Sequence, residues 1–550
     1  MTALDPSWRE LYTPKLFTTL RQGYGLPELR ADAVAGLTVA IVALPLSMAI
    51  AISSGVTPAA GLYTAIVGGF LVSMLGGSRF QIGGPAGAFI VLVSATVARH
   101  GVDGLAIATV MAGLMLLAIG ALRLGGFIKY IPYPVTVGFT AGIAVVIFSG
   151  EIHDLLGLTL SGPEPGPLVP KLQALAAALP TANGAAIALA VLTAGVILGL
   201  RRWRPHWPGL LLAVAAAALV ARLMNLPVET IGSRFGGIPL GFPAPHLPAF
   251  TAAKAVALLP DATAFALLGG IESLLSAVVA DSMSGRRHRS NCELVAQGAA
   301  NIASALFGGI CVTGTIARTA TNVRAGARSP VAGMLHSAFL LVFVLVAAPL
   351  ARYIPLAALA AILGVVAWNM AERGAIAALI RSSRGEAAVL AATFGLTVFR
   401  GLTEGIVVGF ALASLLFLHR MASAVEVVPV PNVEHDPADT AARYDARQAS
   451  DPSVVRLKIS GAFFFGAAGM VAAVLDRLGE HPKAFVLDLS AVSLFDSTAA
   501  ATLEGFVRKA RGQGAEVQIV GAAPAVREAL EHHGVHEPEV RFGPLPVAVS

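Results

Sequence analysis

Residues 267–291 read LLGGIESLLSAVVADSMSGRRHRSN, and residues 311–330 read CVTGTIARTATNVRAGARSP. The first stretch predicts a long apolar helix in which Glu272 is the acid within the apolar run, and the second begins as a short Gly/Thr-rich segment whose first cation is Arg318. A charge near the centre of a bilayer costs about 2.5 to 3.5 kcal/mol, so each should face a partner, a water-filled cavity or a substrate. Burial would favour a neutral Glu272 that carries a proton, whereas a nearby cation would hold it ionised, and the sequence leaves both open.

Composition indicates a membrane protein with many spans. Of 550 residues, 56% are hydrophobic and 13% are charged, whereas soluble domains carry about 25% charged residues. The net charge of +6 does not indicate nucleic-acid binding, because Lys and Arg fall mainly in short loops between apolar segments. Cys292 and Cys311 lack metal-ligand or redox spacing, so we expect buried free thiols, no metal and no cofactor.

The stretch FQIGGPAGAFIVL at residues 80–92 breaks what should be a span. Gly83 and Gly84 interrupt the helix, and Pro85 suits the first turn of a new one. A helix that begins inside the membrane presents free N–H groups and about half a positive charge, which together form a cradle for an anion. The alternative is a Gly/Pro kink that serves only helix packing.

Fourteen membrane segments are expected, after a cytoplasmic N-terminal segment at residues 1–30. With both ends of the chain inside, the arginine-rich loops all become cytoplasmic, as the positive-inside rule requires. The expected segments are 33–52, 59–75, one interrupted at 83–85, 105–122, 134–149, 185–200, 209–223, 255–280, 294–307, 315–323, 331–350, 356–370, 387–399 and 406–419.

Seven segments followed by seven suggest two inverted repeats, at about residues 31–223 and 253–420. The third segment of each half is interrupted: GGSRFQIGGPAGAF at 76–89 and GGICVTGTIARTA at 308–320. Two half-helices in matching positions would point their N-termini at each other near the midplane. The pair therefore predicts a central anion site more strongly than either interruption does alone.

Several motifs resemble the sulfate permease (SulP) family of anion transporters: VALPLSMAIAI (42–52), SRFQIGGPAGAF (78–89), IKYIPYPVTVGFTAGI (128–143), the run 269–298 and GTIARTATNVRAGARSP (314–330). The resemblance covers nearly the whole chain and is closest in appearance to the bacterial DauA-like dicarboxylate branch, with similarity also to bicarbonate transporters. It implies an α-helical polytopic membrane protein of fourteen segments in two inverted seven-segment repeats. It also implies a moving core (segments one to four and eight to eleven), a gate, an elevator mechanism and a homodimer.

The resemblance also implies roles for individual residues. Glu272 matches the acid of the eighth segment, which in the sodium-coupled bicarbonate branch is an aspartate of the sodium site, and Ser276 matches a hydroxyl beside it. Burial of the acid in an apolar helix leads us to expect a proton as the coupling ion at these two residues. Ala86 stands where many relatives have threonine. A structural ion pair between Glu272 and Arg318 is the alternative. The implied substrate-binding residues are Gly84, Pro85, Ala86, Gly87, Gly314, Thr315, Ile316, Ala317 and Arg318.

From residue 424 onward the composition changes. A polar linker is expected at 424–451, and alternating strand and helix periods at 452–550 predict a small cytoplasmic α/β domain. LDLSAVSLFDSTAA at 487–500 resembles the STAS domain of SulP transporters and anti-sigma-factor antagonists. Ser497 opens a helix, where it is either a helix cap or a regulatory phosphorylation or nucleotide site.

These features predict a secondary active transporter of small inorganic or carboxylate anions, of the sulfate, dicarboxylate or bicarbonate class, coupled to protons. Sodium-coupled bicarbonate uptake is the alternative, and a membrane-tethered anion sensor is a third hypothesis. An enzyme is not expected, because the apolar segments contain no His/Asp or Ser/Lys constellation. We expect the chain in the bacterial inner membrane with both termini cytoplasmic, and a cytoplasmic regulator of the STAS domain.

Overall fold

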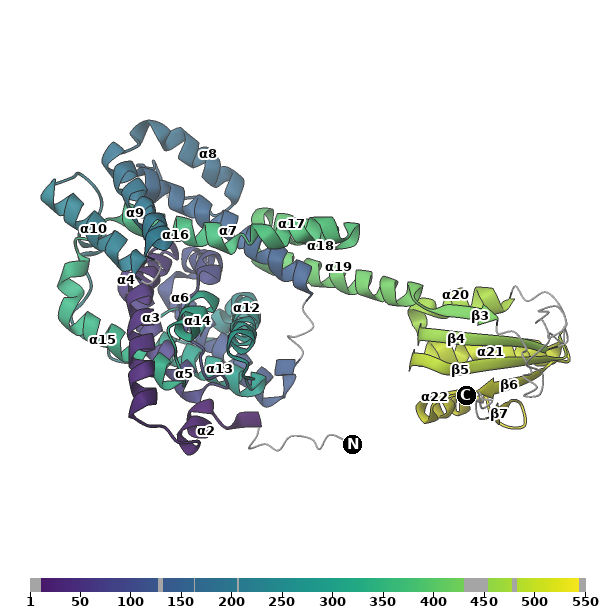
Figure 1. Cartoon of the computed structure of the whole chain (residues 1–550). Coiled ribbons are helices and arrows are strands. Elements are labelled where there is room, and N and C mark those ends of the chain that lie inside the picture. The colour runs from purple at the N-terminus through teal and green to yellow at the C-terminus, as the bar shows by residue number, and fades with distance from the viewer. Residues whose placement is uncertain are drawn as a thin grey trace. The chain divides into compact units, whose positions relative to one another are not determined.

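The computed structural model describes residues 11–126, 132–162, 164–204, 207–429, 454–476 and 482–543. The chain forms two compact units, Met1–Phe410 and Ala411–Ser550. The first unit is helical, and the second contains a five-stranded sheet with helices (Figure 1). The boundary falls inside α19 (Leu402–Ser423), before the predicted end of the transport domain at residue 423.

The first half of the membrane unit follows the predicted order of segments. After α2 (Lys15–Arg21) and α3 (Leu26–Ser53), α4 (Pro58–Tyr63), the π-helix η1 (Thr64–Gly68) and α5 (Gly69–Leu75) form one continuous span. A two-residue strand, β1 (Gly83–Gly84), precedes the remaining elements. These are η2 (Gly87–Phe89), α6 (Ile90–Ala121), α7 (Tyr133–Leu156), α8 (Leu168–Ala178), η4 (Leu179–Thr181), α9 (Gly184–Trp203) and α10 (Gly209–Leu223).

The second half repeats this order with the opposite orientation expected of an odd number of spans. A second two-residue strand, β2 (Thr313–Gly314), comes before its short third segment, α14 (Ile316–Arg324). The other elements are α11 (Ile231–Phe235), α12 (Ala252–Ser284), α13 (Ser290–Leu306), α15 (Val331–Ala351), α16 (Leu356–Met370), α17 (Arg373–Ser382), α18 (Arg384–Phe399) and α19.

The third and fourth segments follow each other without a loop, and the label α6 covers both. Gly101 breaks the helix with φ of 70° and ψ of −177°. Only glycine adopts such a conformation without strain, so the chain turns there while the helix resumes at once. Counting α6 as two segments, the described residues contain the fourteen segments that the sequence predicts, and nine helices are long and apolar enough to cross a membrane.

The helices pack into two groups. In the core bundle, α6 packs on α12 and α13, α3 on α15, and α14 on α3 and α12. In the gate bundle, α7 packs on α16 and α18, and α9 packs on α10 and α16. A Cβ added to Gly113 of α6 would lie 2.7 Å from the carbonyl oxygen of Gly298 on α13. Small residues thus let the core helices approach closely, as is usual in membranes.

Two buried aspartates show the internal repeat at atomic detail. Asp32 Oδ1 on α3 accepts hydrogen bonds from the backbone N–H groups of Arg328 (2.7 Å) and Ser329 (3.1 Å). Asp261 Oδ1 on α12 accepts from Arg99 Nη2 at 2.6 Å. Asp32 and Asp261 are 229 positions apart (261 − 32), and so are Arg99 and Arg328 (328 − 99). In each half, an aspartate of the first helix therefore contacts the place where the half-helix of the other half ends: the loop after α14 for Asp32, and Arg99 beside the break at Gly101 for Asp261.

The second unit is built on the sheet order β3-β4-β5-β6-β7. Buried Leu457, Ile459, Leu487 and Ile519 form its core together with the helices. β3 (Glu426–Pro429) pairs antiparallel with β4 (Val454–Phe463), and the remaining neighbours pair in parallel. The other elements are α20 (Phe465–Asp476), β5 (Ala484–Phe495), α21 (Ser497–Gly512), β6 (Glu516–Val520), α22 (Pro524–His532) and β7 (Arg541–Gly543).

β3 requires a correction to the predicted linker at 424–451. Its four residues form an edge strand of the sheet, because their backbone groups pair with Leu457 to Ser460 of β4. The sequence did not reveal β3, because a strand of four residues gives a weak pattern and a polar stretch follows it from Asn432 onward. Asn432 to Asp451, which carried the linker prediction, lie outside the described residues.

Candidate anion-binding site

The two interrupted segments meet, as the sequence predicts. β1 and β2 pair antiparallel, with Gly83 opposite Gly314 and Gly84 opposite Thr313. Because β1 leads into η2 and α6, whereas β2 leads into α14, the antiparallel pairing sends the two half-helices in opposite directions from one point. Their first turns start at extended residues, Ala86 and Thr315, so free N–H groups and two positive helix ends lie at the junction.

Arg318 reaches from α14 to the other half of the junction. Its Nη2 donates to Ser47 Oγ on α3 at 3.1 Å and to the Pro85 carbonyl oxygen at 3.2 Å. The side chain is only 1% exposed, yet Nε and Nη1 have no hydrogen-bond partner among the described residues. Unpaired buried donors are costly, and charged ones more so, so these two N–H groups are available to an anion.

Gly84 permits this close approach. A Cβ added there would lie 2.4 Å from Arg318 Nη1, and the φ of 157° is one that side chains with a Cβ rarely adopt. The guanidinium therefore lies directly against the backbone of β1. Gly84 and Pro85 thus contact Arg318, and Ala86 is the buried residue before the first turn of η2.

The other predicted cradle residues take different positions. A Cβ added to Gly87 would lie 3.5 Å from Ile147 on α7 and 3.7 Å from Met370 on α16, so Gly87 faces the gate bundle. Thr315 Oγ1 donates to the Ile82 carbonyl oxygen at 3.2 Å. Ile316 and Ala317 have exposed side chains at the start of α14. Their contribution to a site would come from backbone N–H groups.

Glu272 and Ser276 are not joined to Arg318. Glu272 is half-buried on α12 and makes no ion pair with any described residue, so the alternative of a structural Glu272–Arg318 pair is wrong. Ser276 donates to Thr319 Oγ1 on α14 at 3.0 Å. Its neighbour Ser273 accepts from the Gly314 N–H at 3.1 Å and lies 2.9 Å from Thr313 Oγ1. The face of α12 beside Glu272 therefore holds β2 and α14 in place.

Three buried polar residues at this junction were missed by the sequence analysis. Ser47 lies 229 positions before Ser276 (276 − 47), so the repeat itself could have identified it. Gln81 packs against β2, since a Cβ on Gly314 would lie 1.9 Å from its Nε2. His336 on α15 is fully buried. Both ring nitrogens of His336 and both amide atoms of Gln81 lack partners among the described residues. A lone histidine in an apolar span is itself a signal for function.

Ser497 opens α21 in the second unit, but it does not cap the helix. Asp496 is the cap, and its Oδ1 accepts from the Ala499 N–H at 2.9 Å while Oδ2 accepts from the Phe465 N–H at 3.0 Å. The helix-cap interpretation of Ser497 is therefore wrong, because the carboxylate one position earlier takes the free N–H. The Ser497 side chain is exposed, which leaves its hydroxyl accessible.

Comparison with known proteins identifies the family and the fold. Residues 29–393 match the sulfate permease family, and residues 446–543 match the STAS domain. YvdB of Bacillus subtilis (strain 168) is 41% identical over 517 residues, which cover 94% of this chain and 95% of YvdB. The bicarbonate transporter BicA of Picosynechococcus sp. is 31% identical over 520 residues, covering 92% of this chain and 90% of BicA. The murine Slc26a9 structure superposes with a TM-score of 0.86 at 18% identity, covering 99% of this chain and 94% of that one.

The chain belongs to the sulfate permease family and carries a C-terminal STAS domain. The Slc26a9 likeness confirms the fold class: a helical polytopic membrane domain followed by a small α/β domain. The family and its relatives are transporters, so the chain is a multi-pass membrane anion transporter and not an enzyme.

Proposed function

We propose that this chain is a proton-coupled secondary active transporter of a small oxyanion, bound at the junction of β1 and β2. The observation that carries the proposal is Arg318, whose Nε and Nη1 are buried beside two helix N-termini with no hydrogen-bond partner in the part of the chain that the structure describes. Sulfate, a dicarboxylate and bicarbonate all offer oxygen atoms that accept from such a planar pair of donors. The N–H groups of residues 86–87 and 315–317 would complete the site.

Glu272 is the candidate proton carrier. Because it makes no ion pair with Arg318, nothing in the described residues fixes its charge in the ionised state. It lies next to Ser273, which accepts from the backbone of Gly314 in β2. A change in the protonation of Glu272 would therefore act on the residue that positions the cradle. Ser276 would transmit such a change to α14 in the same way, because its hydroxyl donates to Thr319 Oγ1.

An elevator movement of the core bundle is the proposed mechanism. Arg318 and both cradle segments lie in the core bundle, and Gly87 faces Ile147 and Met370 of the gate bundle. The proposed site thus lies next to the boundary between two groups of helices that pack mainly within themselves. Displacement of the core along the gate would carry a bound anion across the membrane.

The distribution of charge and the family support a proposal for the cellular setting. Arg79, Arg286, Arg289 and Arg324 lie in or beside loops between core segments, and basic loops mark the cytoplasmic side. We place both termini there, in the bacterial inner membrane, with residues 31–423 as the transport domain. We further propose a homodimer, and regulation of the domain at 452–550 through the exposed Ser497.

Sodium-coupled bicarbonate uptake is a second candidate, favoured by the relative BicA and by oxygen atoms near Glu272. Ser273 Oγ, Thr313 Oγ1 and the Gly269 carbonyl oxygen are linked at 2.9 Å and 3.2 Å. Carboxylate, hydroxyl and carbonyl oxygens are the ligands that hard cations use.

Proteoliposome flux measurements distinguish these candidates. Uptake of sulfate, succinate, bicarbonate and chloride is measured with external pH and sodium varied separately at fixed internal pH. Uptake that rises on external acidification without sodium supports proton coupling. Strict sodium dependence with a flat pH response would refute it. Anion binding without flux of any of the four anions would favour a sensor over a transporter.

A further inference from the structure

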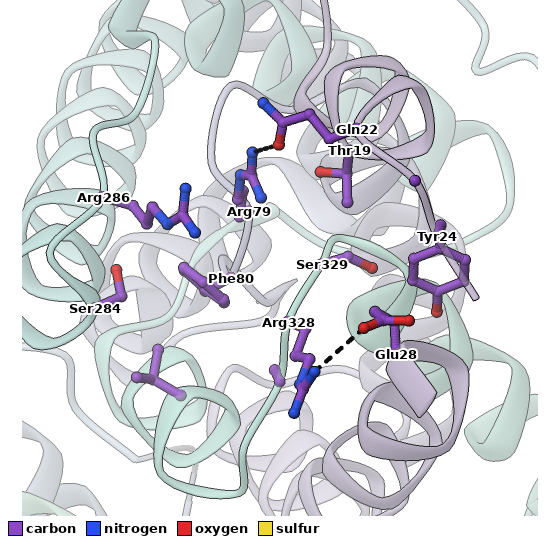
Figure 2. Close-up of a pocket in the computed structure, with 13 residues that line it drawn as sticks. Thr19, Gln22, Tyr24, Glu28, Arg79, Phe80, Ser284, Arg286, Arg328 and Ser329 are labelled. Carbon is purple, nitrogen blue, oxygen red and sulfur yellow. Dashed lines mark hydrogen bonds and ion pairs between the residues drawn. The ribbon is translucent and has the colours of Figure 1, made fainter. Parts of the chain in front are cut away.

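A basic pocket of about 580 Å³ opens at one end of the core bundle (Figure 2). It lies between the N-terminal segment, the loop before β1, the end of α12 and the loop after α14. Figure 2 shows Arg79, Arg286 and Arg328 around it, with Phe80 between them. The lining residues are Thr19, Gln22, Gly23, Tyr24, Glu28, Arg79, Phe80, Ser284, Arg286, Val323, Ala327, Arg328 and Ser329.

The positive charges of this basic pocket are only partly neutralised. Three arginines and one glutamate line it, a formal charge of +2 (three minus one). Glu28 is already paired with Arg328 at 3.2 Å. Arg79 donates to the neutral amide oxygen of Gln22, and Arg286 has no ion pair with any described residue. Burial, with repulsion from Arg286 and Arg289, lowers the pKa of Arg79.

The basic pocket is separate from the proposed transport site. Arg318 does not line it. Val323, which does, follows Arg318 by five positions on α14, or about 7.5 Å along the helix axis. The Phe80 carbonyl oxygen accepts from Asn322 Nδ2 at 2.9 Å, which closes the inner side with a hydrogen-bonded contact between the two halves.

Exposed apolar side chains flank the basic pocket on the N-terminal side. Phe17 and Leu20 of α2 are 52% and 48% exposed, and Leu26 and Leu29 of α3 are 69% and 39% exposed. These residues alternate in the chain with the lining residues Thr19, Gln22 and Glu28. A basic cavity beside apolar side chains at the end of a membrane helix suits an anionic headgroup whose acyl chains lie along the helix.

We infer that the basic pocket binds a phosphate-class oxyanion through Arg79 and Arg286, supplied either free in solution or as the headgroup of an anionic phospholipid. The bound group would replace repulsion between like charges by charge-assisted hydrogen bonds. It would also join the N-terminal segment to the ends of α12 and α14, which belong to the second half. The inference does not depend on the function of Arg318.

The reactivity of a thiol placed in the basic pocket measures anion binding there without measuring binding or transport at the proposed transport site. Ser284→Cys places one thiol in its wall, whereas Cys292 and Cys311 are 2% and 1% exposed and react slowly. The full chain is labelled with N-ethylmaleimide in neutral detergent with inorganic phosphate or with sodium chloride of equal ionic strength. It is also labelled in phosphatidylcholine nanodiscs with and without phosphatidylglycerol. At an anion concentration about ten times its dissociation constant, labelling should slow by about tenfold.

Charge variants in the same background make the test specific. Arg79→Gln with Arg286→Gln should abolish the protection, and Arg286→Gln alone, at an exposed residue, should weaken it without affecting folding. Arg287→Gln is the matched control, because Arg287 adjoins Arg286 but does not line the basic pocket. Arg318→Ala should leave protection intact.

The two sources give different patterns. Protection by inorganic phosphate in detergent identifies a free oxyanion, and protection only by phosphatidylglycerol identifies a headgroup; either supports the inference. The inference is overturned if neither probe protects the thiol. It is also overturned if the folded double variant is protected like its parent, or if Arg287→Gln loses protection equally.

Discussion

Replacing Arg318 by alanine tests the proposed transport site most directly. The substitution removes Nε and Nη1, the two donors that the anion would use and that have no hydrogen-bond partner among the described residues, together with a full positive charge that contacts both cradle segments. One charged hydrogen bond contributes about 1.5 to 3 kcal/mol, and water entering the vacated space would recover part of the loss of two. We expect anion affinity to fall by about 2 to 3 kcal/mol, which is about 30- to 150-fold.

Equilibrium binding of radiolabelled sulfate, succinate and bicarbonate to purified protein measures this loss, and size-exclusion chromatography checks folding. Ser47→Ala is the matched control, because it removes an internal partner of Nη2 at 3.1 Å but leaves both free donors. It should weaken binding by less than about tenfold. Arg318→Lys should fall between the two, since lysine keeps the charge but cannot offer two parallel donors. Unchanged affinity in folded Arg318→Ala would refute the assignment of the site.

Three further predictions follow from the same geometry. Gly84→Ala should destabilise the protein by about 1 to 3 kcal/mol in thermal unfolding, because the new Cβ would lie 2.4 Å from Arg318 Nη1. Gly395→Ala is the control, since a Cβ added there meets nothing within 4 Å. Equal stability of the two variants would contradict the packing of Arg318 against Gly84. Glu272→Gln cannot titrate, so it should flatten the rise of uptake on external acidification while anion affinity changes by less than about threefold; a retained pH response would remove Glu272 from coupling. Truncation near Asn432 should leave anion binding in the membrane unit. If the truncated protein folds but binds no anion, the assignment of the site to the membrane unit is wrong.

The segments of this fold were predictable where an apolar run begins after a proline. The expected ranges 209–223 and 356–370 match α10 and α16 residue for residue, and Pro208 and Pro355 precede them. Proline favours a helix start and the residues that follow are almost entirely apolar. By contrast, the two helices of α6 meet at Gly101 with no loop between them, because a single residue with positive φ is enough to redirect the chain.

The site was predictable only in outline. The Gly/Pro interruption indicated non-helical backbone at residues 83–85, and the stretch 308–320 indicated a second interrupted segment; the antiparallel pairing of β1 and β2 agrees with both. The repeat offset could have singled out Ser47, but not its contact with Arg318, since the two residues lie 271 positions apart in the chain and serine in an apolar helix gives no pattern of its own. Which buried donors stay unpaired is a property of the three-dimensional packing, so no sequence period could reveal it.

The two halves of the duplication contribute different residues at the position of Arg318. The position in the first half that matches Arg318 is Phe89, again 229 positions apart (318 − 89). Phe89 is 1% exposed and packs against Phe265 with ring centroids 6.0 Å apart. Both halves therefore supply a helix N-terminus, but only the second supplies a cation. A second guanidinium at Phe89 would repel Arg318 in a medium of low dielectric constant when no anion is bound. It would also hold an anion more tightly than a transporter that must release it can allow. One charge and two helix ends suit a site that binds and releases its anion in each cycle.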